Sequence, residues 1–470
     1  MTSNFDFGMI GLGVMGRNFI LNVADHGYAA IGLDLDTEKV KALETEGSGK
    51  AVKGVTDTAQ FVAFLKKPRC IMLLVPAGKA VDSVIESLLP LMDAGDLIID
   101  GGNSHFDDTI RRQAYLAEKQ LHFLGTGVSG GSEGARRGPS IMPGGKLEAY
   151  QLVQPILEAV AAKVNDEPCV AYMGEGAAGH YVKMVHNGIE YGLMQLIAET
   201  YDVLKQVGGL SNEELHEVFA QWNQGALQSF LIEITAAIFQ KKDDLSSAYL
   251  VDQLLDKAKQ KGTGKWTSQN AMDLGIPIPT IDAAVTMRGI SALKADRVQA
   301  SKHFDPMENT SARIAKSVLI DLAGDALHFA FITTYAQGLH LLAEAAAAYH
   351  FGLNLETIAR IWRGGCIIRA ALLEKIRQAY SSESDIKHLF LSPVFRDSLA
   401  QGQVSSSMFL GLASEYRLPA MAHAASLHYF NAFTSSRLPL NLVQAQRDYF
   451  GAHTYERVDR EGIFHTDDWD

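Results

Sequence analysis

The stretch Phe7-Gly-Met-Ile-Gly-Leu-Gly-Val-Met-Gly16 decides the fold of the first part of this 470-residue chain. A short apolar run leads into Gly11, Gly13 and Gly16, and an amphipathic segment follows. Glycines at this spacing allow a tight turn, a close approach of the backbone to a pyrophosphate, and close helix–strand packing. The free N–H groups at the start of the following helix would then face the phosphates.

The residues that follow this stretch strengthen the interpretation. A second apolar run, Ala29 to Leu33, ends in Asp34. A glycine motif of this kind is weak evidence alone, but here a strand precedes it, a helix follows it, and an acid ends the next strand. We therefore predict a dinucleotide site. A glycine-rich turn without a nucleotide is the alternative.

Strand-like apolar runs alternate with helical patterns up to about residue 179. This alternation predicts an α/β doubly wound (Rossmann) domain over residues 1–179, with a mostly parallel sheet. Three loops, 75–78, 100–103 and 128–131, follow such runs and are candidate ligand contacts, because ligands bind beyond the carboxyl ends of the strands. The predicted strands are 7–10, 29–33, 70–75, 96–100, 122–128 and 169–173.

The remainder of the chain has a different texture. Residues 180–437 are rich in Ala, Leu, Glu and Gln with helical periodicity, so we predict a large all-α domain. A weak internal repeat relates residues 196–219 to residues 341–362, although two amphipathic helix pairs also resemble each other by chance. Residues 438–470 look irregular and polar, yet they hold many aromatic residues. We expect this extended tail to dock on another surface.

The segment His180-Tyr-Val-Lys-Met-Val-His-Asn-Gly-Ile-Glu-Tyr191 places five polar side chains on one face of a helix. Apolar residues surround this stripe, so both sides of the helix look buried. Buried polar groups need partners, and a substrate rich in hydroxyl groups would supply them. A solvated helix face is the alternative. The stripe consists of Lys183, His186, Asn187, Glu190 and Tyr191.

Composition limits the classes of function. Hydrophobic content of 47% and charged content of 20% are typical of a soluble globular protein. The net charge of −12 argues against a non-specific nucleic-acid or membrane-surface binder. The three cysteines, Cys70, Cys169 and Cys366, are far apart, so neither a disulfide framework nor a zinc site is expected. The N-terminus lacks a basic leader and no apolar stretch looks long enough to span a membrane, so we expect a cytoplasmic protein.

Several motifs together closely resemble those of decarboxylating 6-phosphogluconate dehydrogenases, members of the β-hydroxyacid dehydrogenase superfamily. The match covers essentially the whole chain and keeps the order of the motifs. The helix and tail motifs carry most of the specificity. The motifs are GLGVMG at 11–16, IIDGGN at 98–103, GVSGG at 127–131, GPSIMPGG at 138–145, HYVKMVHNGIEY at 180–191, KGTGKWT at 261–267 and QAQRDYFGAHTY at 444–455.

The resemblance implies oxidative decarboxylation of 6-phosphogluconate to ribulose 5-phosphate and CO2, with reduction of NAD(P), in the pentose phosphate pathway. A hydroxyl β to a carboxylate is oxidised, and Lys183 suits the base if its amine is neutral. As an ammonium, the same group would polarise the ketone and stabilise the enediol oxyanion. Glu190 is the acid that protonates carbon. The β-keto acid is its own electron sink, so no metal is expected.

The resemblance also implies the ligand-binding residues. The residues expected to bind the substrate hydroxyl and carboxylate groups are Asn103, Ser129, Gly130, Gly131, His186 and Asn187. Those expected to bind the substrate phosphate are Tyr191, Lys261, Thr263, Arg288 and Arg447, with His453 nearby. Those expected to bind the dinucleotide are Gly11, Leu12, Gly13, Val14, Met15, Gly16, Asp34, Leu35, Asp36, Val75, Pro76, Ala77 and Asn103.

The chain departs from the family pattern where the cofactor is selected. Most members end the second strand with Asn-Arg-Ser/Thr, and that arginine holds the 2′-phosphate of NADP. Here the three residues are Asp34, Leu35 and Asp36, and Pro76 replaces a lysine. An aspartate accepts hydrogen bonds from a ribose 2′-hydroxyl and repels a 2′-phosphate. NADP is the family default, but these residues favour NAD.

Two other classes of function stay open at this point. One is a different β-hydroxyacid dehydrogenase that acts on another sugar acid, which would not need the phosphate residues. The other is a non-catalytic nucleotide-binding regulator, which would be expected to lack Lys183 or Glu190. The resemblance further implies a homodimer in which the tail of one chain brings Arg447 and His453 to the site of its partner.

Overall fold

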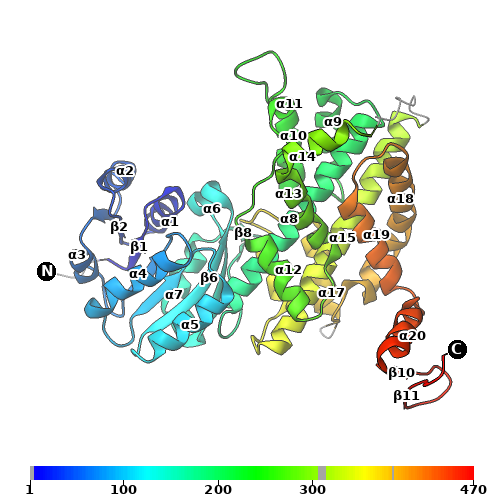
Figure 1. Cartoon of the computed structure of the whole chain (residues 1–470). Coiled ribbons are helices and arrows are strands. Elements are labelled where there is room, and N and C mark those ends of the chain that lie inside the picture. Colours follow the sequence, from blue (N-terminus) through cyan, green and yellow to red (C-terminus); the bar gives the residue numbers. More distant parts are fainter. Residues whose placement is uncertain (1–4, 305–313, 384–385, 470) are drawn as a thin grey trace.

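The computed structural model describes residues 5–304, 314–383 and 386–469. A sheet-containing N-terminal part lies beside a larger helical part, and a C-terminal segment projects from the far end (Figure 1). Residues 1–4, from which we expected the chain to run straight into the first strand, lie outside the described part.

The N-terminal part is built on a seven-stranded sheet of order β3-β2-β1-β4-β5-β6-β7. Neighbouring strands pair in parallel except β6 and β7, which are antiparallel. The doubly wound fold is therefore confirmed. The strands are β1 (Phe7–Ile10), β2 (Ala30–Leu33), β3 (Val52–Val55), β4 (Cys70–Leu73), β5 (Leu97–Asp100), β6 (His122–Ser129) and β7 (Ser140–Gly145).

Helices cover both faces of this sheet because alternate strand residues point to opposite sides. Met9 and Met72 pack in one cluster with residues of α1 and α7. Ile10 and Ile71 pack in another with residues of α3, α4 and α5. The flanking elements are α1 (Val14–Asp25), α2 (Thr37–Glu46), α3 (Thr58–Ala63), α4 (Lys79–Leu88), η1 (Leu89–Leu91), α5 (Phe106–Ala117), α6 (Gly131–Arg137) and α7 (Leu147–Val160).

The predicted strands were partly wrong. Five of the six runs form strands, but 169–173 forms only an isolated bridge between Ile141 and Val170. The sequence analysis missed β3 and β7, as well as the small hairpin of β8 (Lys163–Val164) and β9 (Glu167–Pro168). The three candidate ligand loops do follow β4, β5 and β6, so they share one edge of the sheet.

The helical part begins with α8, whose 29 residues make it one of the two long helices of this part. The 33-residue α15 packs against α8 and α18. The elements are α8 (Ala178–Gln206), α9 (Asn212–Trp222), α10 (Phe230–Gln240), α11 (Leu250–Gln253), α12 (Thr263–Asp273), α13 (Pro279–Ala292), α14 (Lys294–Ser301), α15 (Lys316–Ala348), α16 (Leu355–Trp362), α17 (Leu372–Ser382), η2 (Leu389–Leu391), η3 (Pro393–Phe395), α18 (Arg396–Glu415) and α19 (Met421–Phe433).

The suggested repeat corresponds to two similar helix pairs. In each pair a long helix, α8 or α15, is followed by a short turn and a shorter helix, α9 or α16. Both short helices begin with a side-chain cap: Ser211 accepts a hydrogen bond from the N–H of Glu214, and Asn354 accepts one from the N–H of Thr357.

The first turns of α8 lie directly on the β6–β7 pair, with glycines on both sides of the contact. A Cβ at Gly179 would lie 2.2 Å from the carbonyl oxygen of Gly125. A Cβ at Gly144 would lie 2.1 Å from the nitrogen of Gly179, and one at Gly127 would lie 2.4 Å from the Cβ of Lys183. These distances leave no room for a side chain, so the helix and the sheet are in backbone contact.

The C-terminal segment is more regular than predicted. It forms α20 (Leu440–Gly451) and a hairpin of β10 (Tyr455–Glu456) and β11 (Ile463–Phe464). The buried Asp448 carboxylate organises it by accepting hydrogen bonds from the N–H groups of Thr454 and Thr466. Many large apolar side chains of the segment are nevertheless exposed: Leu440, Leu442, Val443, Tyr449, Phe450, Val458, Ile463 and Trp469.

The expectation that no stretch is long and apolar enough to span a membrane was wrong for α15. This helix meets both criteria, and among the described residues it is the one that does. In its most apolar window, 61% of the residues are buried inside the protein, where the helix packs against α8 and α18. The burial of α15 is therefore that of a core helix, although its length and composition alone would also suit a membrane span.

Candidate active site

The five polar side chains predicted to share a helix face do lie on α8, and four of them are buried. Lys183, His186, Asn187 and Tyr191 are less than 9% exposed, and the Glu190 side chain is 21% exposed. The apolar neighbours Val182, Met184, Val185 and Ile189 are buried as well. A solvated helix face is excluded.

Lys183 and His186 form the centre of this group. Lys183 Nζ lies 3.4 Å from Nδ1 of His186. Burial lowers the pKa of the Lys183 amine, against the opposing charge of Glu190 and the thiol of Cys366. Burial and the nearby Lys183 also hold the pKa of His186 well below its usual value. The imidazole is therefore neutral, and the lysine is biased toward a neutral amine.

Hydrogen bonds fix the orientation of the His186 ring. Nδ1 lies 3.1 Å from Oδ1 of Asn187, which accepts, so Nδ1 carries the proton. Nε2 is then an acceptor, and the Ser129 hydroxyl donates to it over 3.2 Å. The ring also meets Trp362 edge-on at 5.5 Å between centroids. The His186 ring is thus held in one orientation and one tautomer.

Glu190 is placed to hold a proton. Burial raises the pKa of its carboxyl, while Lys183 and Arg288 act in the opposite direction. Its Oε2 lies 4.0 Å from Nδ1 of His186. A carboxyl with a raised pKa and an amine with a lowered pKa on one helix face are suited to act as an acid and a base.

The loop after β6 closes one side of the site, and a second segment supports it. Ser129 ends β6, and Gly130 adopts a φ of +120° at the start of α6. A Cβ at Gly130 would lie 2.6 Å from the carbonyl oxygen of Gly365. The Ile367 N–H donates to the Ser129 hydroxyl oxygen over 3.4 Å. The sequence analysis missed this second segment, for which the Gly364-Gly365 pair was the available signal.

Cationic and hydroxyl groups gather at the Tyr191 end of the stripe. The guanidinium of Arg288, from α13, stacks 3.8 Å from the centre of the Tyr191 ring. Helix α12 begins at Thr263, and a Cβ at Gly264 would lie 2.4 Å from that ring. Lys261 is exposed in the preceding loop. The structure therefore brings together four of the six residues predicted for the phosphate.

The other two predicted phosphate residues lie elsewhere in this chain. Arg447 belongs to α20, where its guanidinium donates to the side-chain oxygen of Gln444. His453 follows that helix and packs against the Phe450 ring. Figure 1 shows α20 projecting away from α8 and α12. Asn103, by contrast, is exposed in the loop after β5, at the same edge of the sheet as Ser129.

The glycine-rich turn fits a dinucleotide. A Cβ at Gly11 would lie 2.5 Å from the carbonyl oxygen of Leu74, and one at Gly16 would lie 1.9 Å from that of Gly11. Nothing lies within 4 Å of the Cβ position of Gly13, which caps α1 and leaves its first N–H groups open. This is the arrangement expected of an anion site at a helix N-terminus.

A pocket of about 520 Å³ adjoins this turn at the carboxyl ends of β1, β2 and β4. It is lined by the predicted residues Gly11, Gly13, Asp34, Leu35, Val75 and Pro76, together with Ile10, Leu33, Lys39, Thr58, Leu74, Ser83, Val84 and Ser87. Other residues predicted from the same sequence stretches do not line the pocket: Leu12, Val14, Met15, Gly16, Asp36 and Ala77.

Asp34 is held at one side of the pocket. One carboxylate oxygen accepts from the N–H of Leu12 over 2.8 Å, and the other accepts from the N–H of Asp36 over 3.0 Å. Lys39 Nζ lies 3.5 Å from Asp34, a contact that the sequence analysis missed. Lys39 follows Asp36 by one helical turn, which was the available signal. The Leu35 side chain is 88% exposed.

Among residues 5–304, 314–383 and 386–469, no cluster of three or more His, Cys, Asp or Glu side chains could hold a metal ion. All three cysteines are buried free thiols. The ionisable groups of the site are therefore those of α8 and its neighbours.

Two family models cover this chain. Residues 6–174 match the NAD binding domain of 6-phosphogluconate dehydrogenase, and residues 179–469 match its C-terminal domain. The chain belongs to the 6-phosphogluconate dehydrogenase family. The two matched segments meet at the start of α8, the helix that carries the buried polar stripe.

Individual relatives in the 6-phosphogluconate dehydrogenase family are similar over nearly their whole length. A protein of Bacillus subtilis (strain 168), named as NADP(+)-dependent and decarboxylating, is 51% identical over 465 residues, 99% of each chain. A Saccharomyces cerevisiae enzyme named as decarboxylating is 48% identical over 96% of this chain and 92% of its own. The Plasmodium falciparum enzyme, solved apo, with NADP+ and with 6-phosphogluconate, superposes with a TM-score of 0.95 at 46% identity, covering 98% of this chain and 99% of its own.

The burial of Lys183 predicts a stability cost that depends on pH. A lysine whose pKa is lowered by folding destabilises the protein fully below its folded pKa. This penalty disappears as pH rises toward the ordinary value of 10.5. Lys183→Met should therefore raise the midpoint of thermal unfolding at pH 7. A gain of about 1 kcal/mol would correspond to roughly 1 °C in a chain of this length, because the unfolding entropy is about 2.1 cal/mol/K per residue.

The measurement is a series of thermal unfolding curves at pH 7, 8, 9 and 10, in which the gain should shrink as pH rises. Lys163→Met, at an exposed lysine of β8, is the matched control and should show no such trend. A gain that is constant over this range, or a less stable Lys183→Met variant, would contradict the assignment.

Proposed function

We propose that this protein catalyses the oxidative decarboxylation of 6-phosphogluconate to ribulose 5-phosphate and CO2, with reduction of NAD(P). The observation that carries the proposal is the buried Lys183 amine beside a neutral His186, with the Glu190 acid on the same helix face. Family membership supports it, since the similar enzymes of Bacillus subtilis and Saccharomyces cerevisiae are named for this substrate and as decarboxylating.

Lys183 acts first as the base. Its desolvated amine accepts the proton of the substrate hydroxyl β to the carboxylate. The dinucleotide, when bound, supplies the acceptor for the hydride of that carbon. Lys183 is then an ammonium, and it polarises the new ketone and stabilises the oxyanion that develops as CO2 leaves. A β-keto acid delocalises these electrons without a metal.

Glu190 completes the reaction as the acid. Burial raises the pKa of its carboxyl and so favours the protonated form, and this proton passes to carbon to give ribulose 5-phosphate. His186, held by Ser129 and Asn187, orients the hydroxyl groups from the Lys183 side. Asn103 and the backbone of Gly130 and Gly131 complete the site for the hydroxyl and carboxylate groups.

The phosphate of the substrate binds at the Tyr191 end of α8. Arg288 supplies a fixed guanidinium, because it stacks on the Tyr191 ring and donates to the carbonyl oxygen of Lys259. Thr263 adds a hydroxyl and the N-terminus of α12, and Lys261 adds an exposed ammonium. Cations and helix N–H groups together suit a phosphate dianion.

The experiment that tests the function measures initial rates with 6-phosphogluconate and each dinucleotide. One CO2 and one ribulose 5-phosphate should form per reduced nucleotide. Lys183→Met should lower kcat by about 10² to 10⁴-fold, and Lys163→Met should not. Glu190→Gln should slow solvent-proton incorporation at C1 of ribulose 5-phosphate. Reduced nucleotide without CO2 would instead indicate a different β-hydroxyacid dehydrogenase.

We propose further that NAD is preferred to NADP, although the Bacillus subtilis relative is named NADP(+)-dependent. Asp34 lines the pocket with a carboxylate that is only 12% exposed. Its repulsion of a 2′-phosphate costs roughly 1 kcal/mol in water and more when desolvated. Leu35 and Pro76 offer no cation, and Lys39 is already paired with Asp34. The family default, NADP, therefore loses its main contacts here.

Catalytic efficiency with NAD should exceed that with NADP by at least about tenfold, the equivalent of roughly 1.4 kcal/mol. The combined change Asp34→Asn, Leu35→Arg and Pro76→Lys should reverse the ratio. Leu35→Met, a neutral change at the same position, is the control and should leave it unaltered. A wild-type preference for NADP would show that Lys39 or another group holds the 2′-phosphate.

We also propose that the protein is a cytoplasmic homodimer. The chain has three units, residues 1–179, 180–437 and 438–470, and the third unit contributes residues to the active site of the neighbouring subunit. The support is the position of Arg447, which lies in a projecting segment rich in exposed apolar side chains. Isolated apolar side chains are ordinary on a surface, but a group of this size marks an interaction site. The substrate site of one chain also lacks two of its predicted phosphate residues.

Mixing two impaired variants, at a substrate concentration too low for either alone, tests the shared site. Arg447→Ala should raise the Michaelis constant, because a charge-assisted contact to phosphate contributes about 1.5–3 kcal/mol. When Lys183→Met and Arg447→Ala subunits exchange, one hybrid site combines both intact residues and part of the activity should return. Arg437→Ala, outside the proposed phosphate set, is the control. Exchange shown by mass without recovered activity would mean that Arg447 serves its own subunit.

A further inference from the structure

A buried polar cluster outside the catalytic stripe joins α8 to the sheet. His180 lies in the first turn of α8, three residues before Lys183, and is 2% exposed. Its Nδ1 lies 2.6 Å from the hydroxyl of Thr109 on α5. Its Nε2 lies 3.0 Å from the carbonyl oxygen of Asp100 at the end of β5. One ring therefore links three elements, α8, α5 and β5.

The directions of these hydrogen bonds follow from the chemistry of the partners. A carbonyl oxygen only accepts, so Nε2 of His180 must carry the proton. Burial lowers the pKa of His180, so the ring is neutral and Nδ1 is an acceptor. The Thr109 hydroxyl then donates to Nδ1 over 2.6 Å, in preference to the more distant carbonyl oxygen of His105 at 3.3 Å. The Asp100 carbonyl sets the tautomer, and Thr109 holds the ring in place from the other nitrogen.

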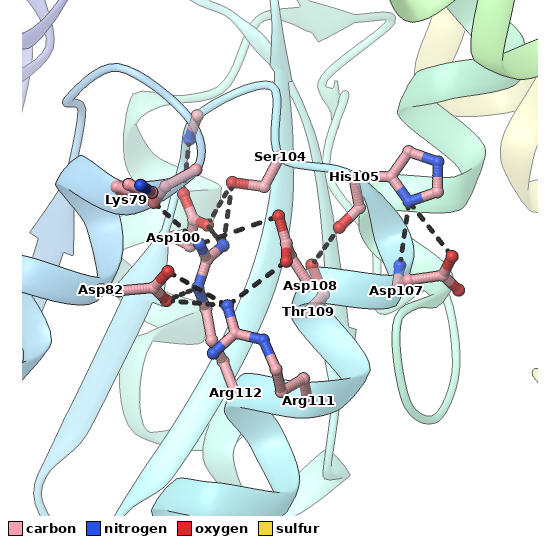
Figure 2. Close-up of polar contacts among 12 residues, drawn as sticks. Lys79, Asp82, Asp100, Ser104, His105, Asp107, Asp108, Thr109, Arg111 and Arg112 are labelled. Carbon is pink, nitrogen blue, oxygen red and sulfur yellow. Dashed lines mark hydrogen bonds and ion pairs between the residues drawn. The ribbon is translucent and has the colours of Figure 1, made fainter.

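The carboxylate of Asp100 is held from the opposite side. Its oxygens accept from the Ser104 hydroxyl over 2.6 Å and from the N–H of Gly102 over 3.0 Å. Arg112, which is 1% exposed, pairs with it at 3.3 Å and also donates to Asp82 and to the carbonyl oxygen of Gly78. Figure 2 shows the Arg112 guanidinium between Asp82 and the Asp100–Ser104 turn. The turn that carries Asn103 is thus fixed at both ends.

A glycine makes room for this pair. A Cβ at Gly125 of β6 would lie 2.5 Å from Cγ2 of Thr109 and 2.9 Å from Nδ1 of His180. The imidazole and the Thr109 methyl group consequently lie against bare backbone. No free space is left here to absorb a small shift of Thr109 or His180. Such a shift would move the Asn103 turn and the start of α8.

We propose that Thr109 and His180 are positioning residues for the hydride transfer. The Thr109 hydroxyl anchors Nδ1 of His180, and His180 holds the Asp100–Asn103 turn, beside the dinucleotide, in register with Lys183. Neither residue needs to touch the substrate. The inference rests on the oxidative decarboxylation proposed above, and the chemistry it concerns is the oxidation step alone.

The matched variants are Thr109→Val, which keeps the shape and removes the hydroxyl, and Thr109→Ser, which keeps the hydroxyl. Thr109→Val should lower kcat by about 10- to 100-fold, the usual effect of a misplacement of about 1 Å. The Michaelis constant for 6-phosphogluconate should change less than about threefold. The deuterium isotope effect on kcat, with substrate deuterated at C3, should increase. Thr109→Ser should behave like the wild type in all three measurements.

Equal losses in both Thr109 variants, or an unchanged kcat and isotope effect in a folded Thr109→Val variant, would overturn the positioning role. Absence of wild-type turnover would instead refute the proposed function. The wild type offers a second measurement, the ring nitrogen shifts of 15N-labelled His180, for which Thr109→Ser serves only to identify the signals. A neutral ring protonated on Nε2 is expected. A ring protonated on Nδ1, or a cationic ring, would overturn the inference.

Discussion

The backbone contact between the start of α8 and the β6–β7 pair is the constraint on which the rest of the structure depends. Gly125, Gly127, Gly144 and Gly179 let the helix approach until carbonyl oxygens and nitrogens of the two elements meet. This closeness removes water from the first turns of α8. It therefore desolvates the Lys183 amine, and it presses His180 against the end of β5. The close packing of α8 against the sheet therefore also lowers the proton affinity of Lys183.

The features that could be predicted from the sequence are those whose signal lies within one short stretch of the chain. The glycine motif and the apolar runs sufficed for β1, β2, β4, β5 and β6, because a buried parallel strand is a continuous apolar run. The strand β3, Val-Lys-Gly-Val, and the strand β7, which contains Pro143 and two glycines, lack that pattern. Proline is tolerated in β7 because it lies at the edge of the sheet. Residues 169–173 are apolar because they pack, although they pair only at Val170.

The same distinction applies to the site. The polar stripe of α8 could be predicted because the spacing of one helix determines which side chains share a face. Contacts between distant segments could not, as with Ile367 beside Ser129 and Thr109 beside His180. The tail was predicted to be irregular because α20 buries only Asp448, and a helix without a buried face leaves little periodic signal.

The straight run of α8 also acts as a ruler. From Lys183 to Tyr191 the axis rises by about 12 Å, at 1.5 Å per residue. The proposed base at one end and the proposed phosphate site at the other are therefore separated along the axis by a length that the backbone fixes. Under this proposal, a phosphorylated sugar acid with a shorter carbon chain would leave one end without contacts, and a longer one would have to bend. Recognition of chain length would then be a property of helix pitch.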